Sequence, residues 1–382
     1  MQHDFYLAWR YLRHHKTRTL ILVSCLSLLA ILPLALHLML DEGERQMSAR
    51  AAATPLLVGA KGSAVDLTLN ALYFIEAAQS RITMAEADRI GATGWADPLP
   101  VYAHFRVQGH PLVGVTLDYF DFRQLVPSQG AMLAMLGECV LGADAAADLK
   151  LKPGDTLLTA PENLFDLAGV YPLKLHVAGV LAKSHSPDDQ AVFIDLQTAW
   201  VIDGLGHGHT EPKASDPQAA DAKLVTYTEI TPENLESFHF HGDPSTYPVS
   251  AVISLPHDRK SSTLLRGRYL SPDQNTQIVQ PLETTRGLLQ NIFRLQALFD
   301  AVLALVGSAT LLALGLVFAL SLRLRQKEIQ TIFLLGCSRL TVARLIAAEC
   351  VLIVLASASV CLALLQPLQY YAGDLVRRFA MP

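Results

Sequence analysis

Two residue patterns in this sequence could support chemistry: a glycine-rich string that contains a lysine, and two pairs of closely spaced histidines. The string is GAKGS at residues 59–63. A phosphate-binding loop needs the spacing GxxxxGK[ST], which wraps backbone N–H groups around the phosphates. Residues 59–63 lack this spacing, so we interpret them as a turn. The sequence also contains no GxSxG and no HExxH motif, so we expect no catalysis by this chain itself.

The histidine pairs could instead bind a metal ion. They are His207 with His209 and His239 with His241. Residues i and i+2 of a β-strand share a face, so each pair could present two imidazoles to one Zn²⁺. Surface histidines also occur without any ligand, and that alternative stays open. The five cysteines have no paired spacing that would add a CxxC site or a disulfide framework.

The composition indicates a membrane protein with a sizeable aqueous part. Of 382 residues, 51% are hydrophobic and 17% are charged, whereas soluble domains average about 25% charged residues. Crossing a bilayer takes about 20 mostly apolar residues in a helix. Three segments without Asp, Glu, Lys or Arg reach that length, namely 19–40, 301–322 and 350–373. The net charge of −5 gives no signature of nucleic-acid binding.

The orientation follows from the cations, because Lys and Arg are retained on the cytoplasmic side. Residues 1–18 carry four cations and one acid, and residues 323–349 carry five cations and two acids. Both segments are therefore expected inside the cell. Residues 41–300 hold 19 cations and 31 acids, as suits a large domain on the outer side.

These patterns predict a membrane α-helical protein with three transmembrane helices and a large extracytoplasmic α/β (α+β) domain inserted between the first two. Strand-like alternation at 99–108 and 112–117, with Gly109 at the turn, supports that domain. Polar residues 206–223 are expected to form a loop. The predicted order is a cytoplasmic amphipathic helix (1–18), a first span (19–40), the external domain with helical stalks (41–300), a second span (301–322), a cytoplasmic segment (323–345), a third span (346–366) and a periplasmic tail (367–382).

Several segments resemble a known family of permeases. AWRYLRHHKTRTLILVS at 8–24, CVLGADAAADLKLKPGDTL at 139–157 and LRLRQKEIQTIFLLGCSRLTVARLIAAE at 322–349 resemble the MacB/FtsX/LolC-type permeases, the mechanotransmitting ABC transporters. The resemblance implies a MacB-like periplasmic domain and a location in the bacterial inner membrane. The family normally has four spans, whereas only 16 residues follow Gln366, too few for another crossing.

The resemblance also implies partners and docking residues. ATP and Mg²⁺ would be held by separate ABC ATPase subunits, and a second permease copy would complete a homodimer. A periplasmic adaptor or substrate-binding protein and membrane lipids are further expected partners, whereas nucleic acid is not. The expected ATPase-docking and coupling residues are Arg325, Lys327, Glu328, Ile329, Ile332, Phe333, Gly336, Ser338 and Glu349.

The expected function is therefore a non-catalytic permease subunit that converts ATP hydrolysis by its partner into conformational work in the periplasm. That work could be efflux, lipoprotein extraction or transmission of force, in a system that could be linked to zinc. The alternative is a membrane-anchored periplasmic metal sensor or chaperone built on the histidine pairs. Each cation of the cytoplasmic segment is explained equally well by the retention of Lys and Arg on the cytoplasmic side. Glu349 could simply be an acid at the end of a span.

Overall fold

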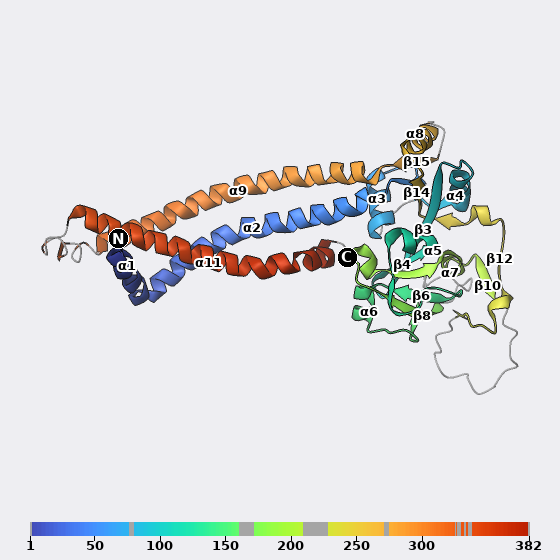
Figure 1. Ribbon diagram of the computed structural model, residues 1–382, viewed down its shortest axis with the longest axis horizontal. Coiled ribbons are helices and arrows are strands. Elements are labelled where there is room, and N and C mark those ends of the chain that lie inside the picture. Colours follow the sequence, from blue (N-terminus) through green and yellow to red (C-terminus); the bar gives the residue numbers. More distant parts are fainter. Residues whose placement is uncertain are drawn as a thin grey trace, which may run out of the picture. The chain divides into compact units, whose positions relative to one another are not determined.

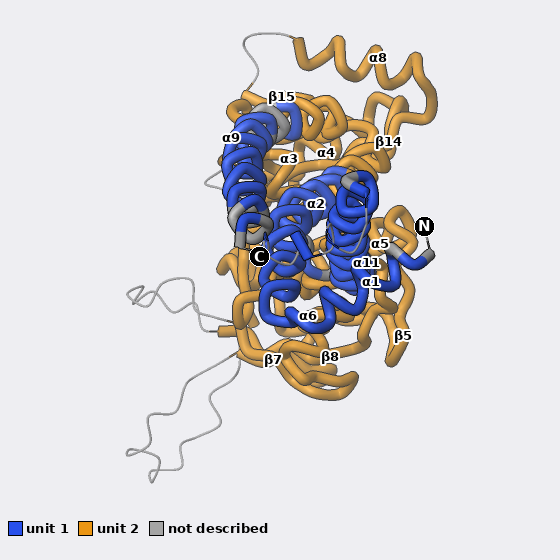
Figure 2. Tube along the Cα trace, turned by 90° about the vertical axis from the view of Figure 1, so that its left-hand side faces the viewer, with its two compact units in different colours: residues 1–44, 289–376 blue, residues 45–288, 377–382 orange. Residues whose placement is uncertain are grey.

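The computed structural model of the chain separates into two compact units, which Figure 2 shows in different colours. Unit 1 comprises Met1–Glu44 and Leu289–Val376, and unit 2 comprises Arg45–Leu288 and Arg377–Pro382. The structure describes residues 2–75, 80–159, 172–208, 228–270, 275–324, 326, 330–331, 334 and 338–380.

Unit 1 is helical (Figure 1). Its residues belong to α1 (Gln2–His14), α2 (Lys16–Ala52), α9 (Pro281–Leu324) and α11 (Arg339–Ala380). Among the described residues, α2 and the Leu340–Gly373 part of α11 are long and apolar enough to cross a membrane. In α9 the corresponding apolar stretch is the shorter Ala297–Ala313. Two of the three expected spans thus have a helix of sufficient length and apolarity, and all three crossings stay predictions.

The helices extend beyond the expected spans. α2 continues to Ala52 and α9 begins at Pro281; we call these two helices the stalk helices. α11 runs through Pro367 to Ala380, so the described part of the expected tail is helical, and its side of the membrane stays a prediction. Proline is tolerated in apolar helices, and the residues after it include good helix formers such as Leu, Gln and Ala.

Small polar residues bring α2 and α11 close together within unit 1. Ser27 Oγ donates to the carbonyl of Ser357 at 3.3 Å, and Cys361 Sγ donates to the carbonyl of Ser27 at 3.3 Å. Both serines are buried. Short side chains allow such close approach of two helices in an apolar surrounding.

Unit 2 is built on one large mixed sheet with the strand order β11-β8-β6-β9-β4-β3-β14-β1-β15, and β5 and β7 also pair with β8. The β4–β9, β6–β8 and β11–β8 pairs are parallel, and the other pairs of this sheet are antiparallel. The strands are β1 (Leu56–Ala60), β2 (Ile82–Thr83), β3 (Ala96–Val107), β4 (His110–Val115), β5 (Pro127–Gly130), β6 (Glu138–Leu141), β7 (Thr156–Leu158), β8 (Leu173–Leu181), β9 (Val192–Asp195), β10 (Gly206–Gly208), β11 (Thr228–Glu229), β12 (Phe238–Phe240), β13 (Pro248–Val249), β14 (Ala251–Pro256) and β15 (Thr276–Val279).

Both faces of the sheet are buried, because neighbouring residues of a strand belong to different hydrophobic clusters. Val192 and Ile194 lie in one cluster and Phe193 lies in the other, as the two-residue period of a strand requires. The helices that cover the sheet are α3 (Ala64–Tyr73), α4 (Met84–Gly91), α5 (Leu117–Arg123), α6 (Ala143–Leu149), α7 (Leu196–Ile202) and α8 (Arg259–Arg268). α3 and α5 contribute to one cluster, and α4, α6, α7 and α8 contribute to the other. The α/β prediction for this domain is confirmed.

Two segments expected to be loop or turn, 206–223 and 59–63, contain regular secondary structure. Residues 206–208, expected within a loop, form strand β10, which pairs with β12; the rest of that loop, from residue 209, lies outside the described residues. In the string 59–63, Gly59 and Ala60 end strand β1, and Ser63 caps α3 by accepting a hydrogen bond from the Asp66 N–H. The turn between β1 and α3 is therefore shorter than expected.

Candidate functional site

The two stalk helices join the sheet through neighbouring strands. α2 ends at Ala52, and β1 begins at Leu56. At the other border β15 ends at Val279, and α9 begins at Pro281. β1 and β15 pair antiparallel, with Leu57 opposite Val279. The strands next to the two stalk helices are therefore paired with each other; three residues separate α2 from β1, and one residue separates β15 from α9.

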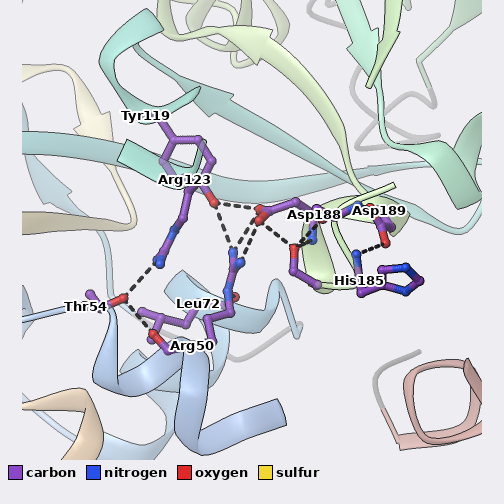
Figure 3. Close-up of polar contacts among 10 residues, drawn as sticks. Arg50, Thr54, Leu72, Tyr119, Arg123, His185, Asp188 and Asp189 are labelled. Carbon is purple, nitrogen blue, oxygen red and sulfur yellow. Dashed lines mark hydrogen bonds and ion pairs between the residues drawn. The ribbon is translucent and has the colours of Figure 1, made fainter. Parts of the chain in front are cut away.

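The last turn of α2 is fixed in unit 2 by a buried ion pair. Arg50 Nη1 lies 2.6 Å from Asp188 Oδ2, and Arg50 Nη2 lies 2.9 Å from Asp188 Oδ1 (Figure 3). The two side chains are only 6% and 2% exposed. Arg50 Nε also donates to the carbonyl of Leu72 at the end of α3. This bidentate geometry is the stronger form of an arginine–carboxylate contact.

Hydroxyl groups complete the surroundings of Asp188. Tyr119 Oη donates to Asp188 Oδ1 at 2.8 Å, and Ser186 Oγ donates to Asp188 Oδ2 at 2.9 Å. Tyr119 is on α5, whose first turn follows β4. Arg123, one turn further along α5, donates from Nη2 to Thr54 Oγ1 at 3.0 Å.

We call Arg50, Thr54, Tyr119, Arg123 and Asp188 the anchor network. Figure 3 shows that they converge from the end of α2, from α5 and from the segment that holds Asp188. The network ties the end of α2 to elements that are far away in the sequence.

The segment that carries Asp188 is held rigidly by its own hydrogen bonds. The Asp189 carboxylate accepts hydrogen bonds from the backbone N–H groups of Ser184 and His185, both at 2.8 Å. His185 adopts a left-handed conformation with φ 56°. A Cβ on Gly142 would collide with the backbone of Asp188 and Asp189, so a glycine is required where this segment crosses the start of α6.

Tyr73 contacts both stalk helices. Its hydroxyl donates to the carbonyl of Met47 in α2 at 2.7 Å, and it shares a hydrogen bond with Thr285 in the first turns of α9. Tyr73 and Thr285 are both buried. One side chain at the end of α3 thus connects the last turns of α2 with the first turns of α9.

The charges of the anchor network shift the pKa values of its members. Burial alone would lower the pKa of Arg50 and raise that of Asp188, but their mutual attraction outweighs burial, so the pKa of Arg50 is raised and that of Asp188 is lowered. Burial, helped by Asp188, raises the pKa of Tyr119 to about 12. Burial and the nearby Arg50 lower the pKa of Arg123. Arg50 and Asp188 are therefore both ionised at neutral pH.

Most of the docking residues expected from the sequence, Arg325, Lys327, Glu328, Ile329, Ile332, Phe333 and Gly336, lie outside the described residues. Ser338 is described, and its hydroxyl accepts a hydrogen bond from the Thr341 N–H at 3.3 Å, which caps the start of α11. Glu349 lies ten residues inside α11 and not at its start, and it is only 1% exposed. Its position inside unit 1 differs from an acid at the open end of a span.

The expected metal ligands are brought together in part. β10 and β12 place His207 directly opposite His239, and the rings of His239 and His241 lie 4.7 Å apart. His209 lies outside the described residues, as does the side chain of His207. Among the described residues no group of three or more His, Cys, Asp or Glu side chains could hold a metal ion. The metal site stays a prediction.

The residues of the anchor network were not predicted from the sequence. Arg50 and Asp188 are separated by 138 positions, and neither belongs to a recognisable motif. The available signal was a single arginine beside the run of alanines at 51–53, where a stalk helix meets an apolar strand.

Comparison with known proteins identifies fold likeness only. No family model matches the sequence, and no curated protein matches it. The periplasmic region of MacB from Actinobacillus actinomycetemcomitans is 12% identical over 62% of this chain and 93% of that chain, with a TM-score of 0.36. The extracellular domain of the noncanonic ABC-type transporter YknZ from Gram-positive bacteria is 13% identical over 59% of this chain and 98% of that chain, with a TM-score of 0.33. Similarity at this level assigns neither a family nor a function.

Proposed function

We propose that this chain is the permease subunit of a bacterial ABC transporter of the MacB/FtsX/LolC type, anchored in the inner membrane. The observation that carries the proposal is the continuity of two long helices, α2 and α9, with the paired strands β1 and β15. Such a connection transmits a change in the helices directly into the sheet. The segments at 8–24 and 322–349, which resemble these permeases, support the same function.

In this proposal ATP is hydrolysed by separate ABC ATPase subunits, and the chain itself does not catalyse. A homodimer of the chain would bind two ATPase subunits through residues 323–345 on the cytoplasmic side. Nucleotide-driven closure of the ATPase subunits would change the angle of the spans, and α2 and α9 would carry that change to the periplasmic domain. The work done there would be efflux, lipoprotein extraction or transmission of force to an adaptor.

The docking segment gives a direct test. Ile329, Ile332 and Phe333 are apolar residues of this segment that we propose an ATPase groove would bury, and Arg325 and Lys327 would contact acidic residues of that groove. We expect Ile332→Asp combined with Phe333→Asp to abolish assembly with the ABC ATPase partner and the stimulation of its ATP hydrolysis. Thr331→Asp is the control, because it adds one negative charge, against two in the double variant, to the same segment at an exposed polar position. Unchanged assembly and turnover in the double variant would refute the docking proposal.

A second candidate function, periplasmic metal binding, is favoured by the register that places His207 opposite His239 and by the contact between His239 and His241. It predicts stoichiometric Zn²⁺ binding by the full chain, measured by calorimetry. Replacement of His239 and His241 by alanine should abolish the binding, whereas replacement of the exposed His257 should not. Absence of heat at micromolar zinc would remove this candidate.

A further inference from the structure

His37 joins α2 to α9 within unit 1, near the end of the first expected span that leads to unit 2. Its Nε2 lies 3.5 Å from Asp300 Oδ2 on α9. Its Nδ1 lies 2.8 Å from the carbonyl oxygen of Pro33, one turn back along α2. The side chains of His37 and Asp300 are 45% and 40% exposed, so the pair can exchange protons with its surroundings.

The two contacts of the His37 ring require a doubly protonated imidazole. A carbonyl oxygen and an ionised carboxylate can only accept hydrogen bonds. A neutral imidazole carries one N–H and can donate to one of them, whereas an imidazolium carries two and can donate to both. The contact between α2 and α9 is therefore complete only while His37 is positively charged.

Pro33 is a weak point of α2, one turn before His37. Proline has no backbone N–H, so the carbonyl of Leu29 lacks its usual helical hydrogen bond, and helices bend at such positions. Pro33 and Asp300 also line a groove of about 550 Å³ between α2 and α9. Since His37 follows Pro33 in α2, its contact with Asp300 closes this groove on the side that leads to unit 2.

The other charged groups of the two stalk helices near His37 are acids. Asp41 and Glu44 follow it by one and two turns on the same face of α2. On α9, Asp300 is the only Asp, Glu, Lys, Arg or His between residues 295 and 322. These acids all favour the charged form of His37, and Asp300 is the one that lies on the other helix.

α11 adds no positive charge near His37. Cys361 of α11 lies beside Ser27 of α2, and the two helices run in the same direction (Figure 1). Ten residues further along each helix, residue 371 is at the level of His37. The titratable residues of α11 within one turn of this level are Tyr370, Tyr371 and Asp374. The side chain of Asp374 lies outside the described residues, and none of the three is a cation.

We propose that His37 and Asp300 form a proton-controlled latch between α2 and α9, closed while His37 is protonated and open when it is neutral. Imidazole changes its charge between pH 5 and 8, where carboxylates are already ionised. Loss of the proton leaves an acceptor nitrogen facing an acceptor carboxylate, so the pair opens and α2 is free to bend at Pro33. An effect on transport would rest on the proposed function, whereas the latch itself does not.

Hydrogen–deuterium exchange of the full chain in detergent tests the latch, because exchange reports the local opening of helices. Exchange is followed by mass spectrometry at about pH 5.5 and pH 8, on the two sides of the imidazole range, and is corrected for the intrinsic rate at each pH. We expect peptides from residues 34–44 and 289–300 to exchange about two- to fivefold faster at the higher pH, the effect of losing one exposed ion pair.

Four variants separate the latch from other effects of pH. His37→Gln and Asp300→Asn should each exchange fast at both pH values, because neither can form the ion pair. His37→Lys keeps its positive charge throughout this range and should exchange slowly at both. His257→Gln is the matched control, because it removes another exposed histidine–aspartate pair, with Asp97 in unit 2, and should keep the wild-type difference.

The proposal is wrong if the wild type exchanges equally at the two pH values, or if Asp300→Asn keeps the difference. It is also wrong if His257→Gln loses the difference, or if His37→Lys exchanges as fast as His37→Gln. The measurement needs no ATPase, and the docking test concerns another segment. Failure of the latch therefore leaves the proposed function standing, and failure of the docking test leaves the latch standing.

Discussion

Arg50 and Asp188 form a contact whose two halves depend on each other. A buried ion pair has a high desolvation cost, and its attraction offsets that cost only while both partners are present. Here the pair also holds the end of α2, through Arg50, against the Asp188 segment and the end of α3. Its expected role is to fix one stalk helix in the domain, and it is not a general source of stability.

Replacing Asp188 or Arg50 alone should therefore destabilise unit 2 more than replacing both residues together. We expect Asp188→Asn to lower the free energy of unfolding of unit 2 by about 3–5 kcal/mol, because Arg50 then stays buried without a counter-charge. Denaturant unfolding followed by tyrosine fluorescence measures this. Asp97→Asn is the control, since it breaks the exposed contact of Asp97 with His257 and should cost less than about 1 kcal/mol. If Asp188→Asn lowers the free energy of unfolding by no more than Asp97→Asn does, the proposed role of the anchor network is wrong.

The anchor network also predicts a dependence on alkaline pH. The pKa of Tyr119 is raised to about 12 in the folded chain, from about 10 in an unfolded one. A raised pKa contributes stability that is complete below pH 10 and is lost as the pH rises through 12. Tyr119→Phe has no ionisable group there, so its melting temperature should fall less than that of the wild type between pH 10 and 12. If the melting temperatures of the two proteins fall equally between pH 10 and 12, the pKa of Tyr119 is the same in the folded and the unfolded chain, and this prediction is wrong.

At the scale of elements, local patterns predicted local structure. The alternation on both sides of Gly109 predicted the β3–β4 hairpin, and β3 and β4 pair around that turn. Residues 138–158 likewise form a local run of strand, helix, turn and strand, which are β6, α6, the turn at Gly154 and β7. In each case the neighbours that decide the structure are close in the sequence.

Contacts between distant parts of the chain could not be predicted in this way. The pairing of β1 with β15 joins residues at opposite borders of the domain, and no periodicity signals it. α3, α5 and α8 are short helices whose few turns give a weak pattern, so the sequence analysis missed them. The anchor network involves two of these helices, because Arg50 donates to the carbonyl of Leu72 on α3 and to the hydroxyl of Tyr119 on α5.

The junction of β1 with α3 gives a prediction about packing. A Cβ on Gly59 would collide with the side chain of Leu67, which is fully buried. We expect Gly59→Ala to destabilise unit 2 by about 1–3 kcal/mol, the usual cost of overpacking. Adding Leu67→Ala should recover part of that loss, so the two changes should not be additive. Additive losses in denaturant unfolding would mean that Gly59 is required for another reason.

At the scale of the whole molecule, the two stalk helices connect unit 1 to the paired strands β1 and β15 at the two borders of residues 45–288. α2 has residues in both units, and so does α9. A helix transmits a change at one end to the other only while its backbone hydrogen bonds are unbroken. The proposed coupling between ATP hydrolysis and the periplasmic domain therefore depends on uninterrupted helix at Glu44–Arg45 and at Leu288–Leu289.

Interrupting both stalk helices should uncouple assembly with the ATPase from the response of unit 2 to ATP. We expect a short Gly-Ser insertion after Glu44, combined with one after Leu288, to leave assembly with the ATPase and the thermal unfolding of unit 2 close to wild type, because glycine disfavours helix only locally. The change that ATP induces in unit 2 should be lost, as read from the fluorescence of a dye on the exposed segment near Gly242. The same insertion at the exposed Gly154 turn is the control and should preserve the response, because it interrupts neither stalk. If the doubly interrupted chain still responds to ATP as the control does, the stalks do not carry the signal, and the proposed transmission from helix to sheet is wrong.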